Sequence, residues 1–340
     1  MFIVRPVRRK DLDQLYGLAK LAKAGLTTLP CDKKILRGRI NESLKGFAKK
    51  MAKPRGEFYL FVMEDTMTGK LVGTASVVSK VGVKDPFYTY EIKTAHKVSK
   101  SLKVEKVIRY LKLRIIRNGP TEIGTLFLKP SARKLRCGRL LAFSRYLFIA
   151  QNRRRFAGKV IAELRGVIDG KGHSPFWNAV CKHFFVVNFK KADLMVMRDK
   201  SFIAELIPRH PIYIPVLPLS AQDVIGQVHA DTVPAMKLLE KEGFTKVPEI
   251  DIFEAGPTLA ARTGHIRTVK ESKIARVVAI VDRVEEGPEY LIANVASYKS
   301  FRVTKDQIMV DRKGVTLTER AARALQIAAG QKVRIVKTKG

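Results

Sequence analysis

Residues Thr121–Gln151 read TEIGTLFLKPSARKLRCGRLLAFSRYLFIAQ, and this stretch decides the fold. The alternating pattern up to Pro130 predicts a β-strand that the proline ends. A helix is expected from Cys137–Arg139 onward, with apolar residues on one broad face and Arg145 and Arg153 among the polar positions. Backbone N–H groups at such a helix start bind phosphate. The stretch predicts a pyrophosphate cradle, although many α/β proteins carry this turn for structural reasons alone.

A second helix is expected at Pro234–Phe244, PAMKLLEKEGF, where Gly243 suits a left-handed helix end, and a strand follows to Phe253. Together the two units resemble the acyl-CoA-binding frame of the GNAT N-acyltransferase superfamily. Residues 2–22 resemble that superfamily's first strand and helix. Residues 57–83 resemble its next hairpin.

Longer blocks resemble one family much more specifically, the arginine N-succinyltransferases, and they follow the family's order over roughly the first 270 residues. These blocks are GLTTLP (25–30), DPFYTY (85–90), GTLFLKP (124–130), GRLLAFSRYLFIA (138–150), VIAELRGVID (160–169), SPFW (174–177), HFF (183–185), KSFIAELIPRHPIY (200–213), AQDVIGQVH (221–229) and DIFEAGPTL (251–259). The resemblance implies transfer of the succinyl group of succinyl-CoA to the α-amino group of L-arginine, giving N2-succinylarginine and CoA in arginine catabolism. Two alternatives remain. One is another CoA-dependent N-acyltransferase that acts on ornithine or a different basic amine, and the other is a non-enzymatic nucleic-acid-binding protein on an acyltransferase fold.

The expected fold class is α+β, with a GNAT N-acyltransferase-like mixed sheet that is elaborated or doubled and a small β-rich C-terminal appendage. Residues 1–265 are expected to form the acyltransferase core, with a first unit at 1–200 that holds the cradle and a second unit segment at 201–265. The proline-rich stretch Pro208–Pro218 separates the two units. Residues 266–340 contain strand-like strings and a helical pattern at 319–329, which predict a small separate domain.

The resemblance also implies a set of CoA-binding residues. The main chain of Leu126 is expected to contact succinyl-CoA, because the superfamily splays this strand so that pantetheine lies along it. Arg133, Arg136, Gly138 and Arg139 are expected around the pyrophosphate. Arg136 stands where the superfamily pattern usually has glycine, and its Cβ puts the usual loop geometry in doubt. Succinyl-CoA is a co-substrate, so no separate cofactor, metal or covalent nucleophile is expected.

His229 is the expected proton donor to the departing CoA thiolate. Superfamily members commonly carry a tyrosine in the terminal helix for this step, but Leu239 stands at that position here. His229 aligns with the family's proton donor, and an imidazole donates protons near neutral pH. The alternative is that His229 only caps the helix it precedes.

The expected substrate-binding residues follow from the charges of arginine and succinate. A guanidinium needs a carboxylate in fork geometry, for which Glu163, Asp169, Asp251 and Glu254 are candidates. The free carboxylate of the succinyl group needs a cation, for which Arg165 is the candidate. Each residue has the alternative of an ordinary structural ion pair.

Charge composition favours a different class of partner at first sight. The chain has 65 Lys plus Arg against 31 Asp plus Glu, a formal net charge of +34, which is a balance typical of nucleic-acid-binding proteins. Residues 93–117 are rich in Lys and Arg, but the interleaved apolar residues predict an amphipathic helical region with a solvated face. No nucleic-acid-binding motif is present, so a nucleic-acid partner is not expected.

Cysteine usage and hydropathy bear on the compartment. Three cysteines at no paired spacing favour a reducing environment. No signal peptide and no run of 18 apolar residues is visible, so a soluble cytoplasmic protein without membrane contact is expected. Assembly into a homo-oligomer through the C-terminal segment is a hypothesis.

Overall fold

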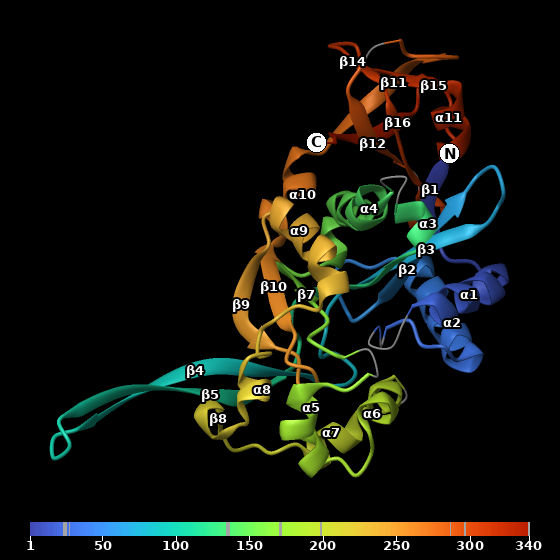
Figure 1. Ribbon diagram of the computed structural model, residues 1–340. Helices are drawn as coiled ribbons and strands as arrows, with labels where there is room; N and C mark the ends of the chain where they lie inside the picture. Colours follow the sequence, from blue (N-terminus) through green and yellow to red (C-terminus); the bar gives the residue numbers. More distant parts are fainter. Residues whose placement is uncertain are drawn as a thin grey trace.

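The computed structural model describes residues 1–22, 26, 28–133, 137–169, 172–197, 199–285, 287–295 and 297–338, with the side chain of Lys190 left out. Within these ranges the strands form one 16-stranded sheet in the order β14-β15-β11-β16-β12-β13-β1-β2-β3-β6-β7-β10-β9-β4-β5-β8 (Figure 1). Most neighbours pair antiparallel, but β6–β7 and β11–β15 are parallel. The expected α+β fold with a mixed sheet is confirmed.

The central strands carry most of the buried residues of the sheet, although β9 is buried only at Glu249 and Ile250. They are β1 (Phe2–Pro6), β2 (Phe58–Asp65), β3 (Leu71–Val78), β6 (Thr121–Leu128), β7 (Lys159–Glu163), β9 (Thr245–Ile250) and β10 (Pro257–Arg262). Along β2, Phe58, Leu60 and Val62 pack with α1 (Leu12–Leu21) and α2 (Lys33–Ala48). The alternate residues Tyr59 and Phe61 lie in the core that contains α4 (Gly138–Gln151). The sequence-predicted strand at 121–130, hairpin at 57–83 and helix from residue 138 are therefore confirmed.

Helix α4 lies at the centre of the molecule. Every residue from Leu140 to Ile149 is buried, because the C-terminal strands cover the side of the helix that faces away from β3 and β6. The expectation of a single apolar face is wrong for this reason. Arg145, expected among solvent-facing polar positions, is only 3% exposed, whereas Arg153 at the helix end is exposed.

The remaining α-helices flank these layers. They are α3 (Pro130–Arg133), α5 (Pro175–Ala179), α6 (Phe189–Val196), α7 (Ser201–Leu206), α8 (Leu219–Gln222), α9 (Val233–Lys241), α10 (Arg267–Glu271) and α11 (Glu319–Leu325). The 3-10 helices are η1 (Arg9–Asp11), η2 (Arg153–Arg155), η3 (Cys181–His183), η4 (Ile214–Val216), η5 (Ala230–Thr232), η6 (Thr263–His265) and η7 (Tyr298–Ser300). The helix expected at 234–244 is α9. In the described residues no helix has the length and apolar character that crossing a bilayer requires.

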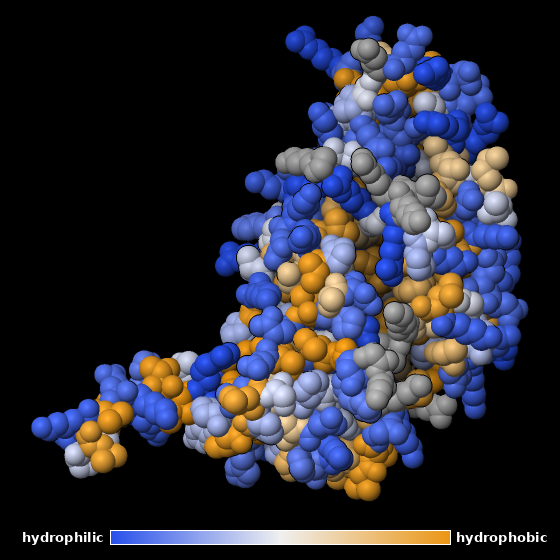
Figure 2. All heavy atoms as spheres, viewed as in Figure 1, coloured by the Kyte–Doolittle hydropathy of each residue, from blue (hydrophilic) through white to orange (hydrophobic). Residues whose placement is uncertain are grey.

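Residues 93–117 form most of a long β-hairpin, so the helical region expected there is wrong. Strands β4 (Phe87–Ser99) and β5 (Val104–Ile116) pair from Phe87↔Ile116 to Ser99↔Val104. Their many Val, Ile and Thr residues favour extended backbone. Figure 1 shows the hairpin projecting from the body, and we call its outer part, residues 93–112, the arm. Figure 2 shows apolar side chains among hydrophilic ones at its end, where Val98 and Leu102 are 70% and 74% exposed.

A second hydrophobic core lies beneath the base of this hairpin. Tyr90 of β4 packs there with the aromatic side chains of α5 and with Phe253. The edge strand β8 (Ile212–Tyr213) pairs with β5 inside the proline-rich stretch. Helices α5, α6 and α7 surround this core, which supports the loop that enters β10 (Figure 1).

The C-terminal residues form the expected β-rich part with one helix. Its strands are β11 (Lys273–Val281), β12 (Glu289–Asn294), β13 (Val303–Gln307), β14 (Met309–Val310), β15 (Val315–Thr318) and β16 (Lys332–Lys337). The pairs Ile3↔Thr304 and Val4↔Val303 join β13 to β1. This part therefore continues the main sheet.

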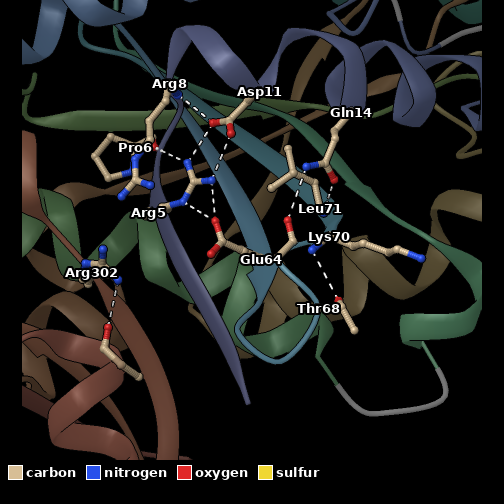
Figure 3. Close-up of polar contacts among 12 residues, drawn as sticks. Arg5, Pro6, Arg8, Asp11, Gln14, Glu64, Thr68, Lys70, Leu71 and Arg302 are labelled. Carbon is tan, nitrogen blue, oxygen red and sulfur yellow. Dashed lines mark hydrogen bonds and ion pairs between the residues drawn. The ribbon is translucent and has the colours of Figure 1, made fainter.

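A buried ion network fixes the beginning of the chain. Arg5 donates from Nη1 and Nη2 to Asp11 at 2.7 and 3.0 Å, and from Nε to Glu64 Oε2 at 2.7 Å (Figure 3). Such bidentate pairs combine charge with directional hydrogen bonds. The network ties β1 to η1 and β2.

Candidate active site

A bulge in β6 shapes the floor of the site. Thr74 pairs with Phe127 and Ser76 with Gly124, so Thr125 and Leu126 both lie opposite Ala75. Thr125 has φ 51°, which is unusual for a β-branched residue. Its hydroxyl shares a 2.8 Å hydrogen bond with Ser76 Oγ. This arrangement turns the main chain of Leu126 out of the regular ladder.

Strands β6 and β7 separate just before the bulge. Their recorded pairs are Thr121↔Val160 and Glu122↔Ile161, after which β7 continues along β10. A cavity of about 390 Å³ fills the opening. Its lining includes Glu122–Phe127 of β6, Ala142, Arg145 and Tyr146 of α4, Ala162–Arg165, Asp231, Thr232, Ala235, Leu238, Leu239, Asp251 and Glu254, together with Arg133. The splayed strand expected at Leu126 is therefore present.

Two glycines allow two backbone segments, residues 164–166 and 254–256, to cross at the far wall of the cavity. A Cβ on Gly256 would lie 2.0 Å from the Leu164 carbonyl oxygen, and a Cβ on Gly166 would lie 2.1 Å from that of Glu254. Only glycine permits so close an approach of two backbones. The crossing places Arg165 and Glu254 on the same cavity.

Four carboxylates gather where this cavity meets a second one. Glu122, Glu163, Asp251 and Glu254 line both the first cavity and its neighbour of about 360 Å³. Asp251 Oδ1 accepts from the N–H groups of Phe253 and Glu254 at 2.7 and 2.8 Å, which shapes the loop that carries Glu254. We call these four residues the acidic cluster.

Burial disfavours the ionised form of all four carboxyls in the acidic cluster, so each has a raised pKa. Burial, followed by Asp251 and Glu122, raises the pKa of Glu163 well above its ordinary value. Burial and then Asp251 raise the pKa of Glu254 in the same way. Buried oxygens of Glu163 and Glu254 have no hydrogen-bond partner among the described residues. A cationic ligand with several N–H donors would relieve both the charge and the missing hydrogen bonds.

Three arginines line the first cavity within the described residues. Arg133 is exposed, and its Nε donates to the Leu128 carbonyl at 3.1 Å. Arg165 is half-buried, with Glu254 as the largest contributor that favours its charge and a buried Nε without a partner. Arg145 donates to the carbonyls of Ala142 at 3.0 Å and Gly124 at 3.5 Å.

His229 lies beside this cavity. Its N–H donates to the Arg165 carbonyl at 2.9 Å, and its Nδ1 accepts from the N–H of Asp231 at 3.1 Å, at the start of η5. In the neutral imidazole this bond places the hydrogen on Nε2. The side chain is partly exposed and does not contribute to the cavity lining, although Asp231 and Thr232 do. Helix capping and proton donation are thus both compatible with its position.

The proposed phosphate end lies at the start of α4. Gly138 is the first residue of the helix, and Arg139 follows it. A Cβ on Gly138 would meet nothing within 4 Å among the described residues, and neither residue lines the cavity. Arg136 falls outside the described residues.

The structure thus brings six of the sequence-predicted residues around one cavity: Leu126, Arg133, Glu163, Arg165, Asp251 and Glu254. Sequence reasoning missed Glu122 and Arg145. The alternation along β6 puts Glu122 on the same face as Leu126, and this pattern could have identified it. Arg145 could be identified only from the structure, which shows that α4 is buried on all sides. In the described ranges, no group of three or more His, Cys, Asp or Glu side chains is arranged to hold a metal ion.

Comparisons with known proteins agree with this geometry. Residues 2–268 match the family model of the arginine N-succinyltransferase beta subunit, and residues 273–337 match that of its C-terminal domain. Arginine N-succinyltransferase from Escherichia coli (strain 55989 / EAEC) is 40% identical over 338 residues, or 99% of this chain and 98% of the relative. The Shigella flexneri protein of the same name gives the same values.

Solved structures extend the likeness to the fold. Arginine/ornithine succinyltransferase subunit AI from Pseudomonas aeruginosa superposes with a TM-score of 0.91 at 34% identity, covering 100% of this chain and 99% of that chain. A GNAT-family acetyltransferase from Desulfovibrio desulfuricans reaches 0.38 at 10% identity, which is too low to carry an argument.

The family match over most of the chain and the full-length relatives define its class as an N-acyltransferase. The chain belongs to the arginine N-succinyltransferase family, as its sequence blocks indicate.

Proposed function

We propose that this chain transfers the succinyl group of succinyl-CoA to the α-amino group of L-arginine, giving N2-succinylarginine and CoA in arginine catabolism. The observation that carries the proposal is the cavity between β6 and β7, which joins an unpaired strand edge to the acidic cluster. The main chain of Leu126 binds the acyl-CoA at that edge. The α-amine of arginine attacks the thioester there.

The acidic cluster receives the guanidinium of the acceptor. Glu163, Asp251 and Glu254 were predicted for this role, and Glu122 joins them at the same wall. Carboxylates with unsatisfied oxygens match the N–H fork of a guanidinium. Arg165 binds a substrate carboxylate on the adjoining wall.

His229 protonates the departing thiolate. The neutral ring accepts the Asp231 N–H at Nδ1; to act as an acid the ring first takes up a proton, and giving that proton to the thiolate returns it to the neutral form that caps η5. Arg133, Arg136, Gly138 and Arg139 surround the pyrophosphate at the start of α4. Support for this part is the position of Arg133 on the cavity and of Gly138 at the first turn of the helix.

A thiol-release assay tests the reaction directly. Purified protein with succinyl-CoA and arginine is expected to release CoA thiol, and mass spectrometry is expected to find arginine heavier by one succinyl group on its α-nitrogen. Release without arginine would indicate hydrolysis. No release in either condition would reject the proposed reaction.

Ornithine is the second candidate acceptor, because the Pseudomonas aeruginosa relative is described as an arginine/ornithine succinyltransferase. A competition assay with equal arginine and ornithine separates the two. The planar fork of arginine satisfies several carboxylates at once, whereas an ammonium is a point charge. We therefore expect more succinylarginine than succinylornithine.

Three further parts of the assignment are proposals. Residues 1–265 act as the catalytic core, and residues 266–340 act as a structural unit that continues its sheet through β13 and β1. Copies of the chain associate as a homo-oligomer, which the exposed apolar residues of the arm support. Sedimentation of the wild type and of Val98→Lys would test association, since a monomeric wild type rejects it. The cytoplasm, where succinyl-CoA is expected, is the proposed compartment.

A further inference from the structure

We propose that Arg145 is the specificity-determining residue that binds the free carboxylate of the succinyl group, leaving Arg165 for the α-carboxylate of the acceptor arginine. The proposal rests on the proposed reaction and specifies which cation serves which substrate. Both substrates carry a carboxylate beside the reacting atoms. Because the cavity also holds four acidic side chains, it has to provide a separate cation for each of the two substrate carboxylates.

The position of Arg145 places it near the acyl group. Its Nη1 is 3.5 Å from the carbonyl oxygen of Gly124, and Gly124 precedes the bulge residues Thr125 and Leu126. Arg145 also stands seven residues into α4 from Gly138, about 10 Å along the helix axis from the proposed phosphate end. An acyl-CoA whose pyrophosphate lies at Gly138 and whose thioester lies at Leu126 therefore brings its acyl chain toward Arg145.

The charge of Arg145 is free to pair with a ligand. Its recorded hydrogen-bond acceptors are the backbone carbonyls of Ala142 and Gly124, and the described residues give it no carboxylate partner. A guanidinium has five N–H donors, so unused donors remain on a side chain that lines the cavity. Burial lowers the pKa of Arg145, which is the signature of a charge that water and acids do little to stabilise. A ligand carboxylate would supply the missing partner.

The two other arginines of the cavity fit this role less well. Arg133 is exposed at the proposed phosphate end. Arg165 has Glu254 and Asp231 near its guanidinium, and its carbonyl accepts the N–H of His229. Those acids offset part of the Arg165 charge. Arg165 also lies next to the acidic cluster that binds the acceptor, so it is the cation within reach of the acceptor's α-carboxylate.

The experiment compares succinyl-CoA with butyryl-CoA, which has the same chain length and no terminal carboxylate. We measure kcat/KM for both acyl donors, with saturating arginine, in the wild type and in Arg145→Met, Arg145→Lys and Arg165→Met. Both values come from the same preparation, so their ratio is independent of the amount of folded enzyme. This keeps the test decisive when a variant of a buried residue gives a low yield.

We expect Arg145→Met to lower kcat/KM for succinyl-CoA by about a hundredfold, the size of a desolvated charge pair, while butyryl-CoA is used as well as before or better. Arg145→Lys, which keeps the charge on a shorter head group, should recover part of the preference. Arg165→Met should leave the succinyl-to-butyryl ratio unchanged. It should instead reduce discrimination between arginine and arginine methyl ester as acceptor.

Arg155→Met is the matched control. Arg155 is also 3% exposed, but it donates to Tyr59 Oη at 3.0 Å and does not line the cavity. Its replacement should lower stability without changing the donor ratio. An equal loss for both donors in Arg145→Met would assign Arg145 a structural role and overturn the proposal, as would a collapse of the ratio in Arg165→Met. A wild type that releases no thiol would reject the reaction itself, and this inference with it.

Discussion

The backbone N–H of His229 donates to the carbonyl oxygen of Arg165 at 2.9 Å. This hydrogen bond holds the backbone of the proposed proton donor directly against the backbone of the arginine that is proposed to bind a substrate carboxylate. Asp231 and Thr232, which follow His229, line the same cavity as Arg165. One backbone hydrogen bond therefore holds the residue proposed to deliver the proton beside the residue proposed to bind a substrate carboxylate.

Replacing His229 separates its capping role from its chemistry. Asn supplies an oxygen acceptor at a helix start, so His229→Asn should keep the thermal stability of the wild type. His229→Ala loses the cap, at about 1 kcal/mol. Both variants should lower kcat about a hundredfold or more with little change in succinyl-CoA affinity, because an acid acts in the transition state. Thiol-release kinetics and thermal melts measure the two effects, and full turnover in either variant would remove His229 from the mechanism.

Glu163→Gln should stabilise the empty enzyme while impairing it. The raised pKa of Glu163 means that its ionised form is disfavoured in the fold, so this group's stabilising contribution is present below its ordinary pKa of 4.5 and is lost as pH rises. At pH 7 the neutral amide removes that penalty. We expect a melting temperature higher by about 2 °C and a kcat/KM for arginine lower by about tenfold to a hundredfold. An unchanged arginine KM and kcat would exclude Glu163 from acceptor binding.

Arginine binding should release protons. A guanidinium favours ionised carboxylates, so it lowers the pKa of Glu163 and Glu254, which burial raises in the empty enzyme. The apparent arginine affinity should therefore increase as pH rises through those raised pKa values. Calorimetry in buffers of different ionisation enthalpy detects the released protons. A binding enthalpy that is independent of the buffer would contradict a shared role of these two carboxyls.

Gly138→Ala tests the phosphate end. An added Cβ meets nothing within 4 Å in the described structure, and alanine favours a helix. The variant should therefore be at least as stable as the wild type but should bind CoA more weakly, since the methyl group occupies the place of the pyrophosphate. We expect an apparent KM for succinyl-CoA several times higher. Arg133→Ala should act in the same direction, and Arg312→Ala, an exposed change in the C-terminal part, is the control that should leave the KM unchanged.

The sequence predicted the elements whose pattern is local. The alternation up to Pro130 and the glycine at Gly243 indicated β6 and the end of α9. Glu163, Arg165, Asp251 and Glu254 were found because each lies in a family-like block. Their meeting at one wall depends on the glycine crossing of residues 164–166 with 254–256, which no single-sequence pattern reveals.

The arm and Arg145 were misplaced for physical reasons. Ile108, Leu111 and Ile115 satisfy helical spacing. The register from Phe87↔Ile116 onward, however, is a relation between two segments that no single segment reveals. Arg145 has a polar side chain inside a helix that α10 and the C-terminal strands enclose. Polarity alone predicts solvent at such a position. The burial of the Arg145 guanidinium can be seen only in the tertiary structure.

The pairing of Ile3 with Thr304 has a consequence for biosynthesis. Strand β1 is synthesised well before its neighbour β13, so its ladder stays incomplete while the residues between them are translated. During that interval β1 has an open edge toward the missing neighbour, and such edges recruit foreign strands. We therefore expect nascent chains that stop before β13 to depend on chaperones, and the full-length polypeptide to refold slowly because this contact joins segments that are far apart in the sequence.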